Sequence, residues 1–119
     1  MSRLRWIIVL ASLAGILLAG SAMAGTTARS AATCKAPKYP GVGYFTSLSV
    51  KHVSCATGKK VAIAYYNCRL RHGKAGRCHS KVLGYTCKET RNSIPTEIDA
   101  RVTCRLHRKT VIHTYQQDL

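Results

Sequence analysis

The sequence predicts an α+β domain in which one amphipathic helix packs on a small antiparallel sheet, a meander of three to four strands, stapled by disulfides. Three observations predict this fold class. Residues 54–73 carry apolar side chains at a helical period, residues 97–106 alternate between apolar and polar side chains, and the chain contains six cysteines. These patterns indicate the helix, the clearest strand and a covalent framework.

The first 24 residues have the layout of a secretory signal peptide. Two arginines precede an apolar run over residues 6–18, and the segment ends in small residues. We expect cleavage after Ala24, because the Ala-x-Ala ending and the glycines that interrupt the run favour processing over a retained membrane anchor. The chain is therefore expected to be secreted or associated with the cell envelope, and its mature part is not expected to span a membrane.

Cleavage at that point leaves 95 residues, which carry 17 of the 19 Lys and Arg and all four acids, for a net charge of +13. A chain of this size forms one domain with a modest core, and exported domains of this size often add covalent cross-links. We assign residues 25–43 to a flexible, turn-rich N-terminal segment and residues 44–119 to a single compact secreted domain. Residues 34–43 contain two prolines and two glycines, which indicates an irregular path.

The compact domain is expected to begin with a strand over residues 44–53 and to continue with a helix. Ser54 stands at the N-cap position, where its hydroxyl accepts a bond from a free backbone amide, and Gly73 stands where the helix should end. The inner face of this helix is predicted to hold Gly58, Val61, Ala62, Tyr65, Cys68 and His72. Because glycine has no side chain, Gly58 is expected to let the helix approach the sheet closely.

The C-terminal half is predicted to form an antiparallel three-stranded meander. Its strands are expected over residues 81–89, 97–106 and 110–116, with residues 91–96 joining the first two and residues 107–109 forming a tight turn. The middle strand is predicted to turn one face to the core, namely Ile98, Ala100, Val102, Cys104 and Leu106.

Three disulfides are expected, because an even number of cysteines in an exported chain indicates pairing. The cysteines are Cys34, Cys55, Cys68, Cys78, Cys87 and Cys104. Neither a structural zinc site nor a redox-active pair is expected, since no C-x-x-C spacing occurs.

The pairing of these cysteines stays open. A turn near Pro95 would place Cys87 and Cys104 opposite one another, but both could instead reach the helix and meet Cys55 or Cys68. Cys68 with Cys78 would close a short loop after the helix. Cys55 and Cys68 lie about 20 Å apart along an intact helix, so they cannot bond to each other. The helix is therefore expected to be tethered at each end to a different part of the domain.

Three short motifs lie within this framework: Val53-Ser54-Cys55-Ala56 with Val61 at the helix start, Val82-Leu83-Gly84-Tyr85-Thr86-Cys87, and Val102-Thr103-Cys104. In their order and spacing they resemble a loose group of small, mostly uncharacterised secreted actinobacterial proteins, over about residues 50–115. The resemblance implies a compact α+β domain exported from a bacterium with a thick or mycolate-type envelope. It brings no activity or binding residues, and Cys68 and Cys78 look like an addition to the commoner pattern.

The positive charge is the strongest functional signal in the sequence. It predicts a non-catalytic binder of anionic envelope polymers or other polyanions, because a strongly basic surface attracts them. The candidate binding residues are Lys59, Lys60, Arg69, Arg71, Arg101, Arg105, Arg108 and Lys109. Two alternatives stay open: a basic surface that serves only solubility, and recognition of a secreted protein partner, for example as an inhibitor.

A small secreted ribonuclease-like hydrolase is a further alternative, because histidines can act as acid and base on either side of a bound phosphate. His113 with His107 or His52 could take these roles, but nothing in the local sequence enforces it. The chain has no G-x-S-x-G, H-E-x-x-H or glycine-rich phosphate motif, and four acids leave little scope for a carboxylate pair. We therefore expect neither enzymatic activity nor a cofactor or metal.

Overall fold

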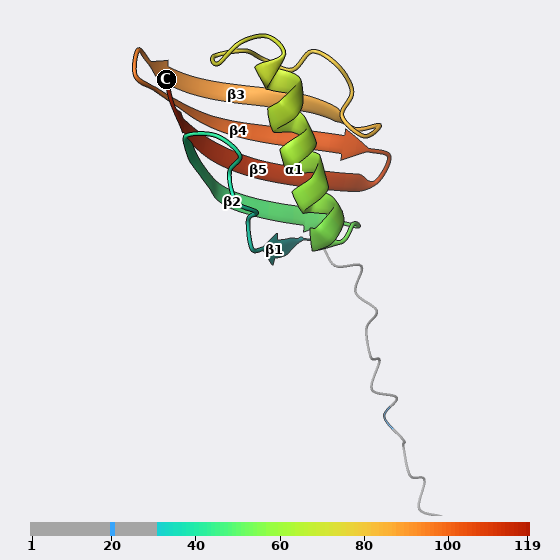
Figure 1. Ribbon diagram of the computed structural model, residues 1–119. Coiled ribbons are helices and arrows are strands. Elements are labelled where there is room, and N and C mark those ends of the chain that lie inside the picture. The colour runs from blue at the N-terminus through green and yellow to red at the C-terminus, as the bar shows by residue number, and fades with distance from the viewer. Residues whose placement is uncertain (1–19, 21–30) are drawn as a thin grey trace, which may run out of the picture.

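The computed structural model describes residue 20 and residues 31–119, so the predicted signal peptide and residues 25–30 lie outside what can be described. One helix packs on one face of a five-stranded antiparallel sheet (Figure 1). The elements are β1 (Ala32–Cys34), β2 (Gly43–Lys51), α1 (Cys55–Leu70), β3 (Thr86–Ile94), β4 (Glu97–Leu106) and β5 (Lys109–Asp118). The α+β fold class is confirmed, and the expected number of strands was slightly low.

The strand order is β1-β2-β5-β4-β3, so the last strand of the meander returns to pair with the strand that precedes the helix. The additional strand is β1, which has three residues and pairs with β2 at the edge of the sheet. Residues 35–42 follow β1 along an irregular path without helix or strand, and Tyr39 in this segment is buried in the core together with Cys34. A strand of three residues has too little periodicity to be predicted.

Helix α1 begins as predicted, because the side chain of Ser54 accepts a hydrogen bond from the backbone N–H of Thr57 at 3.1 Å. The helix ends at Leu70. His72 therefore lies beyond the helix and is exposed, so the prediction that it belongs to the inner face is wrong. The other predicted inner residues are buried. Gly58 lies against the sheet as expected, since a Cβ atom there would be only 2.5 Å from a methyl carbon of Val50.

Strand β3 begins five residues later than predicted. Val82 and Tyr85 exchange two backbone hydrogen bonds of 2.9 and 2.8 Å across a tight turn, in which Leu83 and Gly84 have φ angles of 49° and 84°. Two consecutive residues with positive φ are characteristic of two-residue hairpin turns, so the chain reverses there. The strand then continues to Ile94, and the connection to β4 shortens to residues 95–96.

The disulfides are Cys34–Cys55, Cys68–Cys78 and Cys87–Cys104. Cys87 and Cys104 are directly opposed in the register of β3 and β4. The two helix cysteines bond to different parts of the domain, as predicted: one to the end of β1 and the other to the loop that follows α1. Among the described residues, none of the helices has the length and apolar content needed to cross a membrane.

Candidate functional site

The face of the sheet opposite α1 is not covered by any described element (Figure 1). Strand alternation turns Val102 and Cys104 toward the helix and the residues between and beside them outward. Four exposed cations point outward in this way, and we call them the outer basic face: Lys51 on β2, Lys88 on β3, and Arg101 and Arg105 on β4.

Hydroxyl side chains separate these cations on the same face. In the register, Arg105 lies between Thr86 and Thr110, and Thr110 is followed by Lys51 on β2. Neighbouring strands are about 4.8 Å apart and same-face residues along a strand about 6.7 Å apart. The backbone positions of Arg105 and Lys51 are therefore roughly 10 Å apart. Such spacings suit several anionic groups of one extended polymer better than one small ligand.

The acidic residues are kept away from this part of the face. Of the four acids in the chain, Glu89 is largely buried on the helix side, whereas Glu97, Asp99 and Asp118 lie together where β3 turns into β4 and where β5 ends. The half of the outer face around Arg105 therefore presents positive charge without an exposed carboxylate from the described residues.

The predicted basic residues do not form one patch. Lys59 and Lys60 lie on α1 and Arg71 is its C-cap residue, whereas Arg108 and Lys109 lie at the turn between β4 and β5. Only Arg101 and Arg105 from that set belong to the outer basic face. Lys51 and Lys88 were missed. Lys88 follows Cys87, which is bonded to the inward-facing Cys104, and consecutive strand residues point to opposite faces, so Lys88 points outward.

Arg69 corrects the prediction of a surface site, because its side chain is completely buried. It occupies the helix face turned to the sheet, four residues after Tyr65. Its guanidinium donates hydrogen bonds to the Tyr39 hydroxyl at 3.0 Å, to the Gln117 side-chain oxygen at 2.5 Å and to the Gly76 carbonyl at 3.3 Å. Arg69 therefore serves packing between the helix, the sheet and the following loop. Burial raises the pKa of Tyr39 to about 12, although the neighbouring Arg69 cation opposes that rise.

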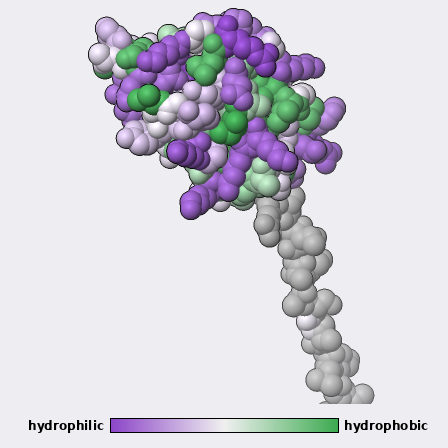
Figure 2. Space-filling model, viewed as in Figure 1, coloured by the Kyte–Doolittle hydropathy of each residue, from purple (hydrophilic) through white to green (hydrophobic). Residues whose placement is uncertain are grey.

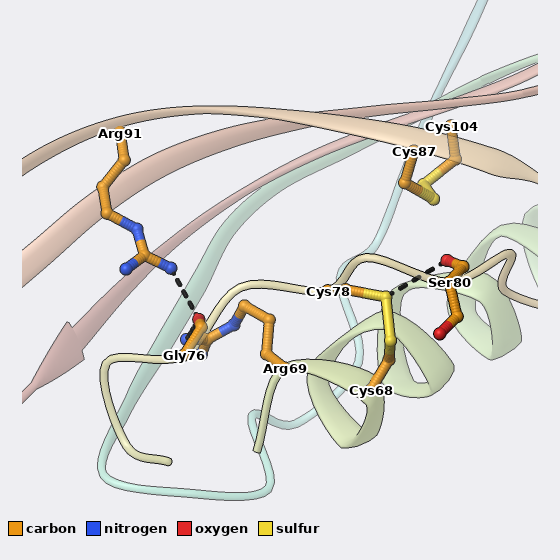
Figure 3. Close-up of a disulfide and its surroundings, with 8 residues drawn as sticks. All are labelled: Cys68, Arg69, Gly76, Cys78, Ser80, Cys87, Arg91 and Cys104. Carbon is orange, nitrogen blue, oxygen red and sulfur yellow. Dashed lines mark hydrogen bonds between the residues drawn. A yellow bond between two sulfur atoms is a disulfide. The ribbon is translucent and has the colours of Figure 1, made fainter. Parts of the chain in front are cut away.

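A second buried group fixes the loop over residues 71–81. The Glu89 carboxylate pairs with Arg91 at 2.8 Å and with Arg77 at 3.2 Å, and it accepts a hydrogen bond from the Tyr115 hydroxyl. Arg91 in turn donates to the carbonyls of Ala75 at 2.7 Å and Gly76 at 2.8 Å (Figure 3). Together with the Cys68–Cys78 disulfide, these contacts hold the loop against β3.

The three histidines considered for catalysis lie in different environments. His113 lies on the helix-covered face of β5, with the rings of Phe45 and Tyr65 at 5.7 and 5.5 Å and with neither ring nitrogen hydrogen-bonded. Burial, and to a lesser extent the Arg69 cation, lower the pKa of His113 to about 4. His52 and His107 are exposed in turns where their φ angles are 56° and 53°. The structure does not bring His113 to the surface beside either of them.

In the described part of the chain, no three His, Cys, Asp or Glu side chains are grouped so that they could hold a metal ion. The sequence matches no protein-family model, and no significant similarity links it to a curated protein or to a solved structure.

Proposed function

We propose that this protein is exported and binds polyanions, such as phosphate-rich polymers of the cell envelope, without catalysing a reaction. The observation that carries the proposal is the outer basic face, in which four exposed cations from three strands share one side of the sheet. A surface of one sign raises the local concentration of oppositely charged polymers. Export is supported by the signal-peptide layout of the first 24 residues and by three disulfides, which persist in oxidising compartments.

The side chains of this face suit phosphate or sulfate groups. Arg101 and Arg105 can each donate two parallel hydrogen bonds to such a group, whereas Lys51 and Lys88 act as compact point charges. The threonine hydroxyls between them offer further donors. An open face accommodates an extended chain, so we expect recognition of charge density rather than of a particular sequence of monomers.

The test uses inorganic polyphosphate as the probe and neutral dextran as its control. The purified, oxidised protein should bind polyphosphate and not dextran. Its affinity should fall with salt as a straight line on logarithmic axes with a slope of about −3, because four contacts with a flexible anionic strand each release about 0.7 counterion. Electrostatic binding is strongest at low salt, so the lowest concentration tested is about 50 mM. Absence of binding there would reject the proposal.

Two variants of equal charge separate the face from net charge alone. In the first, Lys51, Lys88, Arg101 and Arg105 are all changed to glutamine. In the matched control, the exposed Lys35, Lys38, Lys74 and Lys81 are changed to glutamine. The first variant should lose about tenfold or more in affinity and lower the salt slope, whereas the control should keep most of both. Equal losses would mean that binding depends on total charge and not on this face.

A further inference from the structure

One end of the sheet combines exposed apolar and acidic side chains. It lies where β3 turns into β4 and where β2 begins and β5 ends. Three large apolar residues there are more than half exposed, at 63% for Val42, 66% for Tyr44 and 57% for Ile94. We call this region the acidic end, and it consists of Val42, Tyr44, Ile94, Glu97, Asp99 and Asp118.

Repulsion between carboxylates of the acidic end lowers the stability of the fold. Glu97 and Asp118 are directly opposite one another in the register of β4 and β5, and like charges in that position destabilise a sheet. None of the three acids forms an ion pair with another described residue, although Lys and Arg outnumber Asp and Glu by 19 to 4. A cation supplied from outside this chain would relieve the repulsion.

A second surface has the complementary character. A shallow, open groove lies between α1 and the turn before β3, with a volume of about 440 Å³ and a mainly apolar wall. We call it the basic groove, and its lining residues are Lys59, Lys60, Ile63, Ala64, Asn67 and Leu83. On the α1 side of the molecule, hydrophobic surface lies directly beside hydrophilic surface (Figure 2).

Leu83, which lines this groove, is both exposed and in an unfavourable backbone conformation. Its side chain is 60% exposed, and its backbone has a φ of 49°, in the left-handed region that bulky residues rarely occupy. The turn that it forms with Gly84 is one in which asparagine is favoured at the first central position. Leucine is thus costly here both for the backbone and for solvation, and no contact within the fold compensates by burying it. Outliers of this kind are concentrated at functional sites.

We propose that the acidic end of one copy of this protein docks into the basic groove of a second copy. Charge complementarity selects the occupant: the carboxylates around Glu97 would meet Lys59 and Lys60, while Ile94 and its apolar neighbours would cover Leu83. Among the described residues, the four large apolar side chains that are more than half exposed all belong to these two surfaces. The pairing would bury all of them together.

The two surfaces lie near opposite ends of β3, because Leu83 shortly precedes its first residue and Ile94 is its last. Nine residues of strand separate them by about 30 Å. Because the two surfaces of one copy are this far apart, each can engage a different neighbour in a head-to-tail contact, which builds open chains or rings of copies. Asp99 lies two residues from Arg101 on the same side of β4, so the contact would border the outer basic face. Lys51, Lys88 and Arg105 lie farther from the acidic end, so an assembly would still present these cations from several copies to one polymer.

The association is tested by sedimentation velocity in about 0.15 M salt, where charges more than about 8 Å apart are largely screened. Small interfaces are weak, so the oxidised protein is examined from about 20 μM to about 1 mM. The mean mass should rise with concentration. A variant with Glu97→Lys and Asp99→Lys should stay monomeric, and so should a variant with Lys59→Glu and Lys60→Glu.

Mixing gives the sharper result. When the two variants are combined in equal amounts they should associate again, because each supplies the charge that the other lacks, although both remain strongly cationic. A matched control with Lys35→Glu and Lys38→Glu should associate like the unaltered protein. Monomers at all concentrations, association of either charge variant alone, or a monomeric mixture would each overturn the proposal.

A further substitution separates the contact from stability of the fold. Leu83→Asn places the favoured residue in the turn, so the melting temperature should rise while the association constant falls at least about fivefold, as expected when an apolar anchor is removed. A lower melting temperature or unchanged association would contradict the role given to Leu83. No polyanion is present in these measurements, so their outcome is independent of the proposed function.

Discussion

The guanidinium of Arg69 lies over the aromatic ring of Tyr115, with its central carbon 4.5 Å from the ring centroid, and the whole residue is buried between helix and sheet. The main acceptors that it contacts also have other donors. The side-chain oxygen of Gln117 also accepts a hydrogen bond from the Tyr39 hydroxyl at 2.6 Å. The Gly76 carbonyl also accepts one from Arg91 at 2.8 Å.

We therefore predict different costs for two substitutions of Arg69. Alanine leaves a cavity and should lower the free energy of unfolding by about 3–5 kcal/mol. Methionine fills much of the volume and leaves those acceptors bonded, so it should cost far less. Chemical denaturation measures both, with Arg71→Ala on the surface as a control that should change stability by less than about 0.5 kcal/mol. Equal costs for the two substitutions would show that the charge itself is required.

The second prediction concerns pH. The pKa of His113 is lowered from 6.5 to about 4, so the unfolded chain binds a proton in this interval and the folded chain does not. Stability contributed by neutral His113 should be complete above pH 6.5 and should be lost as the pH falls toward 4. The total loss is of the order of 3 kcal/mol. Denaturation at a series of pH values between 6.5 and 4 should show that the free energy of unfolding depends less on pH in His113→Leu than in the unaltered chain. An equal dependence in both would contradict the prediction.

Gly58 provides the third prediction. Alanine normally favours a helix over glycine by about 1 kcal/mol. Here the added methyl group would meet Val50, so Gly58→Ala should instead destabilise the domain by about 1–3 kcal/mol. Combining it with Val50→Ala should cost less than the sum of the two single changes, because the second substitution makes room for the first. Strict additivity in thermal denaturation would show that the contact between helix and sheet adjusts freely.

The fourth prediction concerns the loop after α1. Replacing Cys68 and Cys78 by alanine removes a cross-link with a sequence separation of 10, which should lower the free energy of unfolding by about 3 kcal/mol. The loop should nevertheless stay in place, because Arg91 bonds to two of its carbonyls and Gln117 donates to that of Lys74 at 2.7 Å. Hydrogen exchange should find the Gly76 amide, which is bonded to the Gly73 carbonyl, still protected. Loss of that protection would mean that the disulfide alone, and not these hydrogen bonds, holds the loop in place.

Much of this fold could be predicted because its signals are local. The hydroxyl of Ser54, the inner face of α1 and the alternation along β4 depend on neighbouring residues, and each is found where the pattern indicates, except that His72 lies beyond the end of α1. The opposition of Cys87 and Cys104 was one of several possible pairings. It became definite only with the register of β3 and β4, which depends on where the chain turns.

The remaining features depend on tertiary contacts that a linear pattern does not contain. Arg69 reads as a surface cation because arginine is seldom buried, and its burial requires Tyr39 and Gln117, which are 30 and 48 residues away. The late start of β3 follows from a hairpin turn built on leucine instead of asparagine. The outer basic face needed the strand order, since Lys51 and Arg105 are brought to one side only when β5 pairs with β2.

The disulfides also determine how the protein transmits mechanical force. If residues 31 and 119 are pulled apart, tension passes from Cys34 directly to Cys55, from Cys68 to Cys78 and from Cys87 to Cys104. Strand β2 and the turn between β3 and β4 lie inside closed covalent loops, so the tension cannot extend their backbone. Even after α1 and β5 have come away from the sheet, the chain cannot reach its full contour length until these bonds are reduced.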